Sequence, residues 1–200
     1  MREILTGIFT WPWFSQPHGY NFNGHFIRHA DGNLCIDPVE PTAEDLEELA
    51  SCGVTRILLT NRNHSRAANK VRARTGARTA IHTADAPHAR KEGAELDDAL
   101  KPGDKVGPFS VIGVPGKSPG EIALHWPERK ILLVGDAIVG DPPGRCKLLP
   151  DKVVDDPARL RETVRGLLAF DFETLLVGDG EPILQFANER VRELVDTFPE

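Results

Sequence analysis

The chain has 200 residues, of which 40% are hydrophobic and 27% are charged, and its formal net charge is −6. This composition is typical of a globular protein, no apolar run is long enough to span a membrane, and the negative charge does not favour nucleic-acid binding. The three cysteines have irregular spacing, which argues against a disulfide framework and a CxxC metal site and favours a reducing cytoplasm.

The first half of the chain predicts short strands and then an alternation of helices and strands. The opening MREILTGIFTWPWF lacks the features of a signal peptide and is interpreted as a strand. More strands are expected up to CIDP, and again at TRILLT and TAIHTA. One helix is expected in PTAEDLEELASCG, between a Thr42 cap and Gly53, and another from Ser65 to Thr75, ended by Gly76.

The second half predicts antiparallel strands from GDKV to ILLVGD, with a hairpin turn at PER. Asp156 and Pro157 suit the start of a helix that runs through Leu168, and TLLVGDG is a further strand. The last helix is expected to begin at Pro182. Its predicted apolar face consists of Leu184, Ala187, Val191, Leu194 and Phe198. Since no linker divides the chain, we expect one domain over residues 1–200.

Several predicted strands end abruptly in polar or glycine-flanked residues. ILLTN, ILLVGD and TLLVGDG follow this pattern, and the loop PGKSPG follows the strand SVIGV. In layered α/β folds, ligands bind beyond the ends of strands, because side chains there are exposed while the strands fix their positions. Four such ends predict a shared pocket.

These segments resemble the motifs of the metallo-β-lactamase superfamily. Members have THxHxDH after a buried strand, then GH(S/T)PG, then a strand that ends in GD, and a final GHG. This chain has TNRNHSR at 60–66, GKSPG at 116–120, GD at 135–136 and GDG at 178–180. The opening YNFNGHFIRHADGNLCIDP also resembles the family's first hairpin. The resemblance implies an α/β fold, a four-layer αββα sandwich with a site at the sheet edges.

Measured against that resemblance, most of the family's metal ligands are replaced. The bridging aspartate is kept as Asp136, and His64 occupies a spacer position in the first motif. The residues at the other ligand positions are Asn61, Asn63, Ser65, Arg66, Lys117 and Asp179. Amide oxygens are weak neutral ligands, and lysine and arginine are cations that repel a metal ion.

One hypothesis follows from this replacement: the ammonium of Lys117 takes the place of a metal ion and pairs with Asp136, Asp179 or both. The amides of Asn61 and Asn63 would complete a hydrogen-bond network. We therefore expect no metal cofactor, and a pseudoenzyme whose pocket binds a small molecule, an anion being one candidate, or a protein partner. The expected pocket residues are Asn61, Asn63, His64, Ser65, Arg66, Lys117, Asp136 and Asp179.

Two alternatives keep an active enzyme. The first is a metal-dependent hydrolase in which His64, Asp136 and Asp179 hold zinc, iron or manganese, since three donors of these types are chemically adequate. The second is metal-free catalysis, with Lys117 as a base or Schiff-base amine, or with His64 as a general acid or base. Pairing with carboxylates disfavours Lys117 as a nucleophile. The candidates for a catalytic role are His64, Lys117, Asp136 and Asp179, and no role is assigned to any of them.

The seven cations between Arg56 and Arg78 form a block that contains no acidic residue. They are interpreted as a solvated helix face, with an anion-attracting rim as the alternative. Nucleic-acid binding is disfavoured because the block has no interleaved aromatic residues. Cys146 is taken as a bystander thiol, since a nucleophilic thiol needs a neighbouring base. We expect a cytoplasmic protein with no membrane partner, and the oligomeric state stays open.

Overall fold

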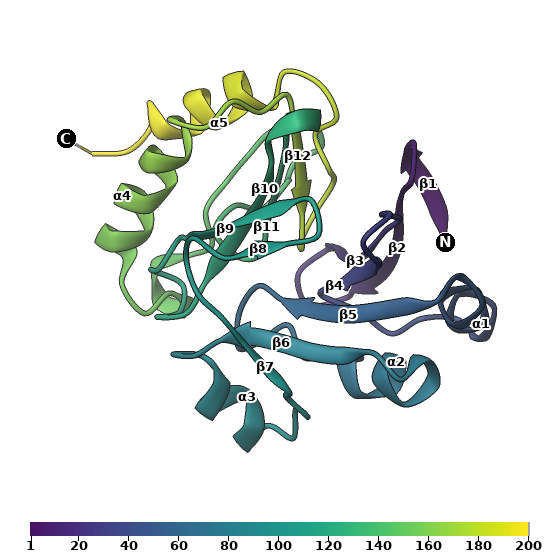
Figure 1. Ribbon diagram of the computed structural model, residues 1–200. Helices are drawn as coiled ribbons and strands as arrows, with labels where there is room; N and C mark the ends of the chain where they lie inside the picture. The colour runs from purple at the N-terminus through teal and green to yellow at the C-terminus, as the bar shows by residue number, and fades with distance from the viewer. Residues whose placement is uncertain (200) are drawn as a thin grey trace. The chain divides into compact units, whose positions relative to one another are not determined.

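The computed structural model describes residues 1–199, and the chain forms two compact units, Met1–Leu100 and Lys101 onward. Each unit has its own β-sheet with helices packed against it (Figure 1). Among the described residues, no helix is both long enough and apolar enough to cross a lipid bilayer.

Unit 1 contains a seven-stranded sheet whose strands follow chain order from β1 to β7. The first four strands pair antiparallel, and those from β4 onward pair parallel. Parallel pairing brings the carboxyl ends of successive strands to the same edge of the sheet. The strands are β1 (Arg2–Leu5), β2 (Ile8–Ser15), β3 (Tyr20–Ile27), β4 (Asn33–Ile36), β5 (Val54–Leu59), β6 (Arg78–His82) and β7 (Asp98–Leu100).

The β2–β3 hairpin separates buried from exposed aromatic residues. The indole of Trp11 is buried and lies across from Gly24, where a Cβ atom would come within 2.4 Å of the indole ring. Glycine at this position therefore makes room for the tryptophan. Further along the same strand, Trp13 and Phe14 are 45% and 50% exposed, so the WPWF segment is core at one end and surface at the other.

Three helices pack on the unit 1 sheet and share one apolar cluster with it. They are α1 (Ala43–Cys52), α2 (Ala68–Thr75) and α3 (Ala86–Lys91). The predicted caps of α1 are confirmed, because the Thr42 hydroxyl accepts a hydrogen bond from the Asp45 N–H, and Gly53 adopts the left-handed conformation. The predicted end of α2 at Gly76 is confirmed in the same way.

The predicted start of α2 at Ser65 is wrong by three residues. The carbonyl of Ser65 accepts from the N–H of Ala68, and the N–H of Ala67 donates to the carbonyl of Pro38, outside the helix. The segment before Ala68 is therefore a turn that is bound to the end of β4. Helix α3 and strand β7 were not predicted, because both are short and show no apolar periodicity.

Unit 2 contains a five-stranded sheet in the order β12-β11-β10-β9-β8. All its neighbouring strands are antiparallel except β11 and β12, which are parallel. The predicted hairpin at PER is a short 3-10 turn between β10 and β11. The strands are β8 (Lys105–Val106), β9 (Phe109–Gly113), β10 (Ile122–Trp126), β11 (Ile131–Val134) and β12 (Thr174–Val177).

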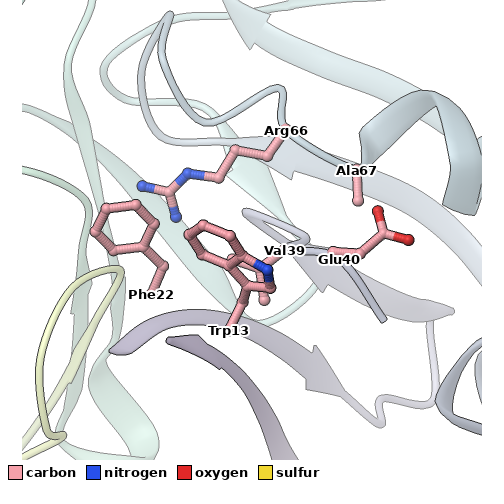
Figure 2. A pocket seen from close by; sticks show the side chains of 6 residues that line it. All are labelled: Trp13, Phe22, Val39, Glu40, Arg66 and Ala67. Carbon is pink, nitrogen blue, oxygen red and sulfur yellow. The ribbon is translucent and has the colours of Figure 1, made fainter. Parts of the chain in front are cut away.

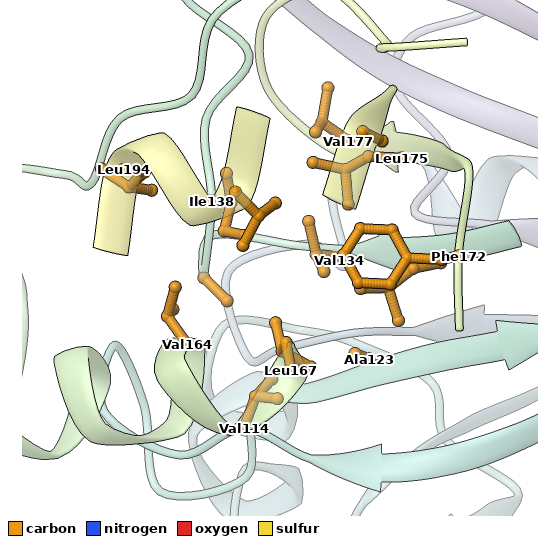
Figure 3. Close-up of a cluster of buried hydrophobic side chains, with 14 of the residues drawn as sticks. Val114, Ala123, Val134, Ile138, Val164, Leu167, Phe172, Leu175, Val177 and Leu194 are labelled. Carbon is orange, nitrogen blue, oxygen red and sulfur yellow. The ribbon is translucent and has the colours of Figure 1, made fainter. Parts of the chain in front are cut away.

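Two helices cover this sheet, α4 (Pro157–Leu167) and α5 (Ala187–Val195). Val164 and Leu167 of α4 and Leu194 of α5 belong to one buried cluster with apolar side chains of the strands (Figure 3). The predicted start of α4 is confirmed, since the Asp156 side chain accepts from the N–H of Arg159.

The predicted start of α5 at Pro182 is wrong by five residues. Ile183 instead exchanges two backbone hydrogen bonds with Leu175 of β12, and Phe186 adopts a left-handed conformation directly before the helix. Leu184 is 37% exposed and does not belong to the apolar face. The apolar spacing that suggested an earlier start belongs partly to a strand-like segment.

Candidate functional site

In unit 1, the polar segment after β5 forms a tight turn. The side chains of Asn61 and His64 are fully buried, whereas those of Asn63 and Arg66 are exposed and Ser65 is half-buried. The Asn61 side chain builds the turn, because its Oδ1 accepts from the N–H of Asn63 at 2.8 Å. Asn61 is therefore a structural residue of this loop, whatever further role it has.

A buried carboxylate, Asp37, organises the same loop from the end of β4. Its Oδ1 accepts from the Thr60 N–H at 2.8 Å, and its Oδ2 accepts from the Thr60 hydroxyl at 2.5 Å. The Nδ1 atom of His64 lies 2.8 Å from the same Oδ2. Because a carboxylate only accepts hydrogen bonds, Nδ1 carries the proton, and the imidazole ring has a fixed orientation.

Arg66 leaves this loop toward the β2–β3 hairpin. Its guanidinium carbon lies 4.2 Å from the centroid of the Phe22 ring, which is a cation–π contact. Arg66 and Phe22 line a pocket of about 400 Å³, and Figure 2 shows the guanidinium pointing toward Phe22 and Trp13. Arg66, the residue at the last histidine position of the first motif, therefore contacts the aromatic side chains of the hairpin.

In unit 2, two carboxylates follow neighbouring parallel strands. Val134 and Val177 are paired in register, and Asp136 and Asp179 each come two residues later, after an identical LLVGD segment. Both side chains are buried, and a carboxylate oxygen of one lies within 4.8 Å of a carboxylate oxygen of the other. Two like charges this close repel each other, and a cation between or beside them offsets that repulsion.

Lys117 supplies one such cation. Its Nζ lies 2.9 Å from Oδ2 of Asp136, and the two side chains are 10% and 7% exposed. The predicted pairing of Lys117 with Asp136 is therefore present. Water screens a pair this deeply buried much less than it screens a surface pair.

The loop that carries Lys117 is held against the start of α4. The carbonyl of Gly116 accepts from the N–H of Asp156 at 2.8 Å, and the Thr163 hydroxyl donates to the carbonyl of Pro115 at 3.0 Å. A Cβ atom on Gly116 would lie 2.4 Å from the Leu160 backbone. The first glycine of GKSPG, Gly116, is thus required by this close packing, which positions Lys117.

The basic block of unit 1 is neutralised on the surface. Cations of this block form ion pairs with acidic residues of the same unit, among them Arg56, Lys70, Arg72, Arg74 and Arg78. Hydrogen bonding to Arg78 lowers the pKa of Asp98 below its ordinary value. This arrangement supports the interpretation as a solvated face over that of an anion-attracting rim.

The thiol of Cys146 is not activated. Burial raises its pKa to about 12, and the charge of Glu193 adds to the effect. A thiol in this environment is protonated at neutral pH and is a poor nucleophile. The interpretation of Cys146 as a bystander thiol is thereby supported.

Comparison with known proteins identifies the family. The family model described as metallo-beta-lactamase superfamily matches residues 4–198. The chain belongs to this superfamily. A hydroxyacylglutathione hydrolase of Fuscovulum blasticum is 34% identical over 164 residues, which cover 77% of this chain and 60% of that relative. The chain therefore spans less than two thirds of the length of this curated relative.

Solved metallo-β-lactamase structures agree with the family match. A metallo-β-lactamase from Erythrobacter litoralis superposes with a TM-score of 0.76 at 19% identity, and the match covers 98% of this chain and 96% of that one. The protein TTHA1623, solved in a di-iron-bound form, gives a TM-score of 0.66 at 23% identity over 86% of this chain and 93% of that one. The predicted metallo-β-lactamase-like α/β fold is confirmed.

The expectation of no metal cofactor is contradicted by these comparisons. The curated relatives are hydrolases of this metallo-superfamily, and a structural neighbour holds two iron ions. The expectation gave too much weight to the lost histidines. It gave too little weight to Asp136 and Asp179, which keep two buried carboxylate donors together in unit 2. The comparisons likewise give no support to the pseudoenzyme interpretation.

The motifs located most of the polar residues described above but did not reveal the partners of His64. The first motif indicated the loop that holds Asn61, His64 and Arg66, and the later motifs indicated the unit 2 residues. Asp37 and Thr60 were not recognised as partners of His64. The available signal was the aspartate in CIDP, directly after the expected strand, since β4 and β5 are parallel neighbours whose ends meet.

Proposed function

We propose that this protein is a metal-dependent hydrolase with an atypical ligand set. The observation that carries the proposal is the pair of buried carboxylates, Asp136 and Asp179, at matching positions after two parallel strands. Buried carboxylates held this close to each other are disfavoured unless cations compensate them. The ammonium of Lys117, 2.9 Å from Asp136, carries one positive charge beside these two carboxylates, and carboxylates are also donors that divalent ions accept.

The chemistry of these donors fits a divalent ion. Carboxylate oxygens bind iron, manganese and zinc, and imidazole nitrogen suits iron and zinc as well. His64 is the imidazole that the first motif offers. Since its Nδ1 donates to Asp37, a bond to metal would be made by Nε2, and a carboxylate behind a histidine is the usual support of a metal-binding imidazole.

A metal ion held by these residues would lower the pKa of a bound water molecule and polarise the carbonyl group of a substrate. The protein's own groups have other tasks. Asp37 keeps His64 in one tautomer and one orientation. Lys117 offsets the negative charge of Asp136 and, as a hydrogen-bond donor, can also orient an anionic substrate group.

For the substrate we propose a thioester of the hydroxyacylglutathione type. The support is the name shared by the curated relatives, of which the one from Fuscovulum blasticum is 34% identical. That relative is longer than this chain, so its substrate is carried over only as a class: an acyl group attached to sulfur.

The proposal is tested by metal analysis and thioester hydrolysis on the same preparations. The full chain is loaded with zinc, iron or manganese, desalted, and analysed for bound metal, and its hydrolysis of S-lactoylglutathione is followed. Asp136→Ala and Asp179→Ala should each lower bound metal and hydrolysis at least tenfold. His64→Ala tests the third donor in the same assays.

Asp171→Ala is the matched control, because Asp171 is an exposed aspartate of unit 2 that pairs with Lys130. It should leave metal content and hydrolysis unchanged. If the wild-type chain holds no metal after loading and desalting, the proposal is wrong and the pseudoenzyme interpretation returns. If metal binds but the thioester is not hydrolysed, the substrate class is wrong.

We also propose that the protein works in the cytoplasm, without a membrane or nucleic-acid partner. Cys35, Cys52 and Cys146 are free thiols, which supports a reducing compartment. The surface pairing of the basic block supports the absence of a nucleic-acid partner.

A further inference from the structure

Unit 2 contains a buried glutamate, Glu121, to which the proposed hydrolase chemistry assigns no role. It directly precedes strand β10, and its side chain is 1% exposed. A glutamate buried to this extent is uncommon, because taking a carboxyl group out of water costs free energy that hydrogen bonds must offset. The contacts of Glu121 therefore indicate its task.

The side chain of Glu121 reaches the residue that follows Asp136. Its Oε1 accepts from the N–H of Ala137 at 3.1 Å, and Ala137 is itself fully buried. This N–H belongs to the planar peptide group that joins Asp136 to Ala137. The hydrogen bond therefore orients that peptide group and, with it, the Cα atom from which the Asp136 carboxylate extends.

The strand register explains why the two acidic residues meet. Strands β10 and β11 are antiparallel, and Ala123 is paired with Val134. In an antiparallel pair, two steps back along one strand correspond to two steps forward along the other, which places Glu121 across from Asp136. Both residues therefore lie just beyond the ends of neighbouring strands, at the same edge of the unit 2 sheet.

The backbone of Glu121 closes the loop that carries Lys117. The Glu121 carbonyl accepts from the N–H of Val114 at 2.9 Å, and Lys117 lies between these two residues in the chain. Lys117 in turn pairs with Asp136. Glu121 is thus connected to both members of the ion pair, through its backbone to the lysine and through its side chain to the aspartate.

The chain before Asp136 is fixed by a different contact. The carbonyl of Val134 accepts from the N–H of Gly178 at 2.9 Å, and Gly178 directly precedes Asp179. Asp136 is therefore supported on its N-terminal side by the strand that leads to Asp179, and on its C-terminal side by Glu121. Loss of the Glu121 contact would release the second side.

We propose that Glu121 is a positioning residue for the candidate metal ligand Asp136. Its carboxyl oxygen acts as a hydrogen-bond acceptor that keeps the Asp136 carboxylate in a ligating position and beside Lys117. The inference rests on the proposed function, because it concerns the ion that Asp136 would bind. Groups that orient a metal ligand from behind contribute about ten- to hundredfold to metal affinity.

Two conservative variants separate the reach of this side chain from its charge. Glu121→Gln keeps an acceptor oxygen at the same distance but is neutral, whereas Glu121→Asp keeps the acidic group but is one methylene shorter. We expect Glu121→Asp to weaken Zn²⁺ binding roughly tenfold or more, and Glu121→Gln to weaken it less than about threefold. Zn²⁺ affinity of the full chain is measured by competition with a chelator.

The absorption spectrum of bound Co²⁺ is a second readout, because it reports the arrangement of the ligands around the ion. The spectrum of Glu121→Asp should differ from that of the wild type, and the spectrum of Glu121→Gln should match it. Urea denaturation of the metal-free proteins measures stability separately, so weaker metal binding is not confused with unfolding. If Glu121→Asp does not fold, Glu121→Met, which has a similar length but no carboxyl oxygen, takes its place.

Glu173 provides a matched control in the same unit. Its Oε1 also accepts a backbone hydrogen bond, from the N–H of Phe186 at 3.0 Å. It is exposed and precedes β12, whereas Asp179 follows the other end of that strand. Glu173→Asp should therefore leave the Zn²⁺ affinity and the Co²⁺ spectrum unchanged.

The outcomes distinguish this inference from the proposed function. If the wild type holds neither ion after loading and desalting, both fail together. If the wild type binds metal, this inference alone is overturned when the shortened or Met variant keeps the wild-type affinity and spectrum. It is also overturned when Glu121→Gln weakens binding as much as Glu121→Asp does, or when Glu173→Asp has an equal effect.

Discussion

Asp37 shows how much one side chain contributes to the loop after β5. It has a left-handed backbone conformation with φ of 48°, which is uncommon for a residue other than glycine. Its carboxylate accepts from the backbone and the hydroxyl of Thr60 and lies beside Nδ1 of His64. All these groups are buried. The left-handed conformation of Asp37 is therefore stabilised by the hydrogen bonds of its side chain rather than by backbone preference.

Replacing Asp37 with alanine should lower the free energy of unfolding by about 3 kcal/mol, because buried donors lose their acceptor. Urea denaturation followed by circular dichroism measures the change. Asp31→Ala is the control, since the side chain of Asp31 is 78% exposed in a turn, and it should cost less than about 0.5 kcal/mol. A loss of under about 1 kcal/mol for Asp37→Ala would contradict the role assigned to this carboxylate.

Sequence reasoning could locate this loop but not its partner. TNRNHSR could be placed at the end of a strand because the apolar run Ile57–Leu59 precedes it. Asp37 lies 27 positions before His64, and the two meet only because β4 and β5 are parallel, with Ile36 paired to Leu58. Long-range strand register of this kind is not encoded in a local pattern.

At the scale of elements, the repeated LLVGD segments explain how two carboxylates come together. Each segment ends a strand and the two strands are paired in register, so the aspartates two residues beyond the strand ends lie at the same edge of the sheet. A second loop then fixes the turn after Asp179. The Gly140 N–H donates to the Asp179 carbonyl at 3.0 Å, and the Gly140 carbonyl accepts from the Glu181 N–H at 2.7 Å.

Gly180→Ala should disturb this arrangement. Gly180 has φ of 89°, and a Cβ atom there would lie 2.3 Å from the Gly140 carbonyl oxygen, so the two loops must separate. We expect a loss of about 2 kcal/mol or more in stability, together with at least tenfold weaker metal binding, measured by denaturation and by metal analysis.

Gly166→Ala is the matched change within the same unit. It lies inside α4, where nothing is within 4 Å of the added Cβ atom. Alanine favours a helix over glycine by about 1 kcal/mol, so this variant should be slightly stabilised. Equal effects of the two substitutions would show that the contact between the two loops does not hold Asp179.

Element prediction succeeded where local rules and burial agreed. The capping residues Thr42 and Asp156 and the end of α2 at Gly76 followed from side-chain and backbone preferences alone. Helix α5 was extended too far because its apolar spacing continues back into a segment that pairs with β12. The pairing overrides the helical pattern there, since it satisfies the backbone groups of Ile183.

For the whole molecule, the net charge of −6 does not reveal that many basic and acidic side chains form ion pairs at the surface. The cations of the basic block meet acids from distant parts of unit 1, including α1 and β7. Such pairs individually contribute little, but protonating their acidic partners removes them together. The stability of the molecule should therefore depend on pH at the acidic end.

The lowered pKa of Asp97 determines the direction in which stability changes with pH. A backbone hydrogen bond from Thr79, and then the side chain of Arg72, lower its pKa below the ordinary value of 3.8. A lowered pKa in the folded state stabilises the protein above pH 3.8, and this contribution is lost as pH falls through the folded-state pKa.

We therefore expect the urea midpoint to fall steeply below about pH 4. Asp97→Asn should lower the midpoint at pH 7 and flatten the decline, whereas Asp31→Asn, at an exposed turn, should leave both unchanged. Parallel curves for the wild type and Asp97→Asn would contradict this assignment.

The ion pair between Lys117 and Asp136 has a consequence for the proposed binding of a metal ion. An incoming ion must compete with an ammonium group that is tethered to the same chain, and not with water alone. The degree of loading would then follow the free-ion level of the surroundings. Under the proposed function, protein prepared under chelation would keep the Lys117–Asp136 ion pair while it lacks hydrolase activity.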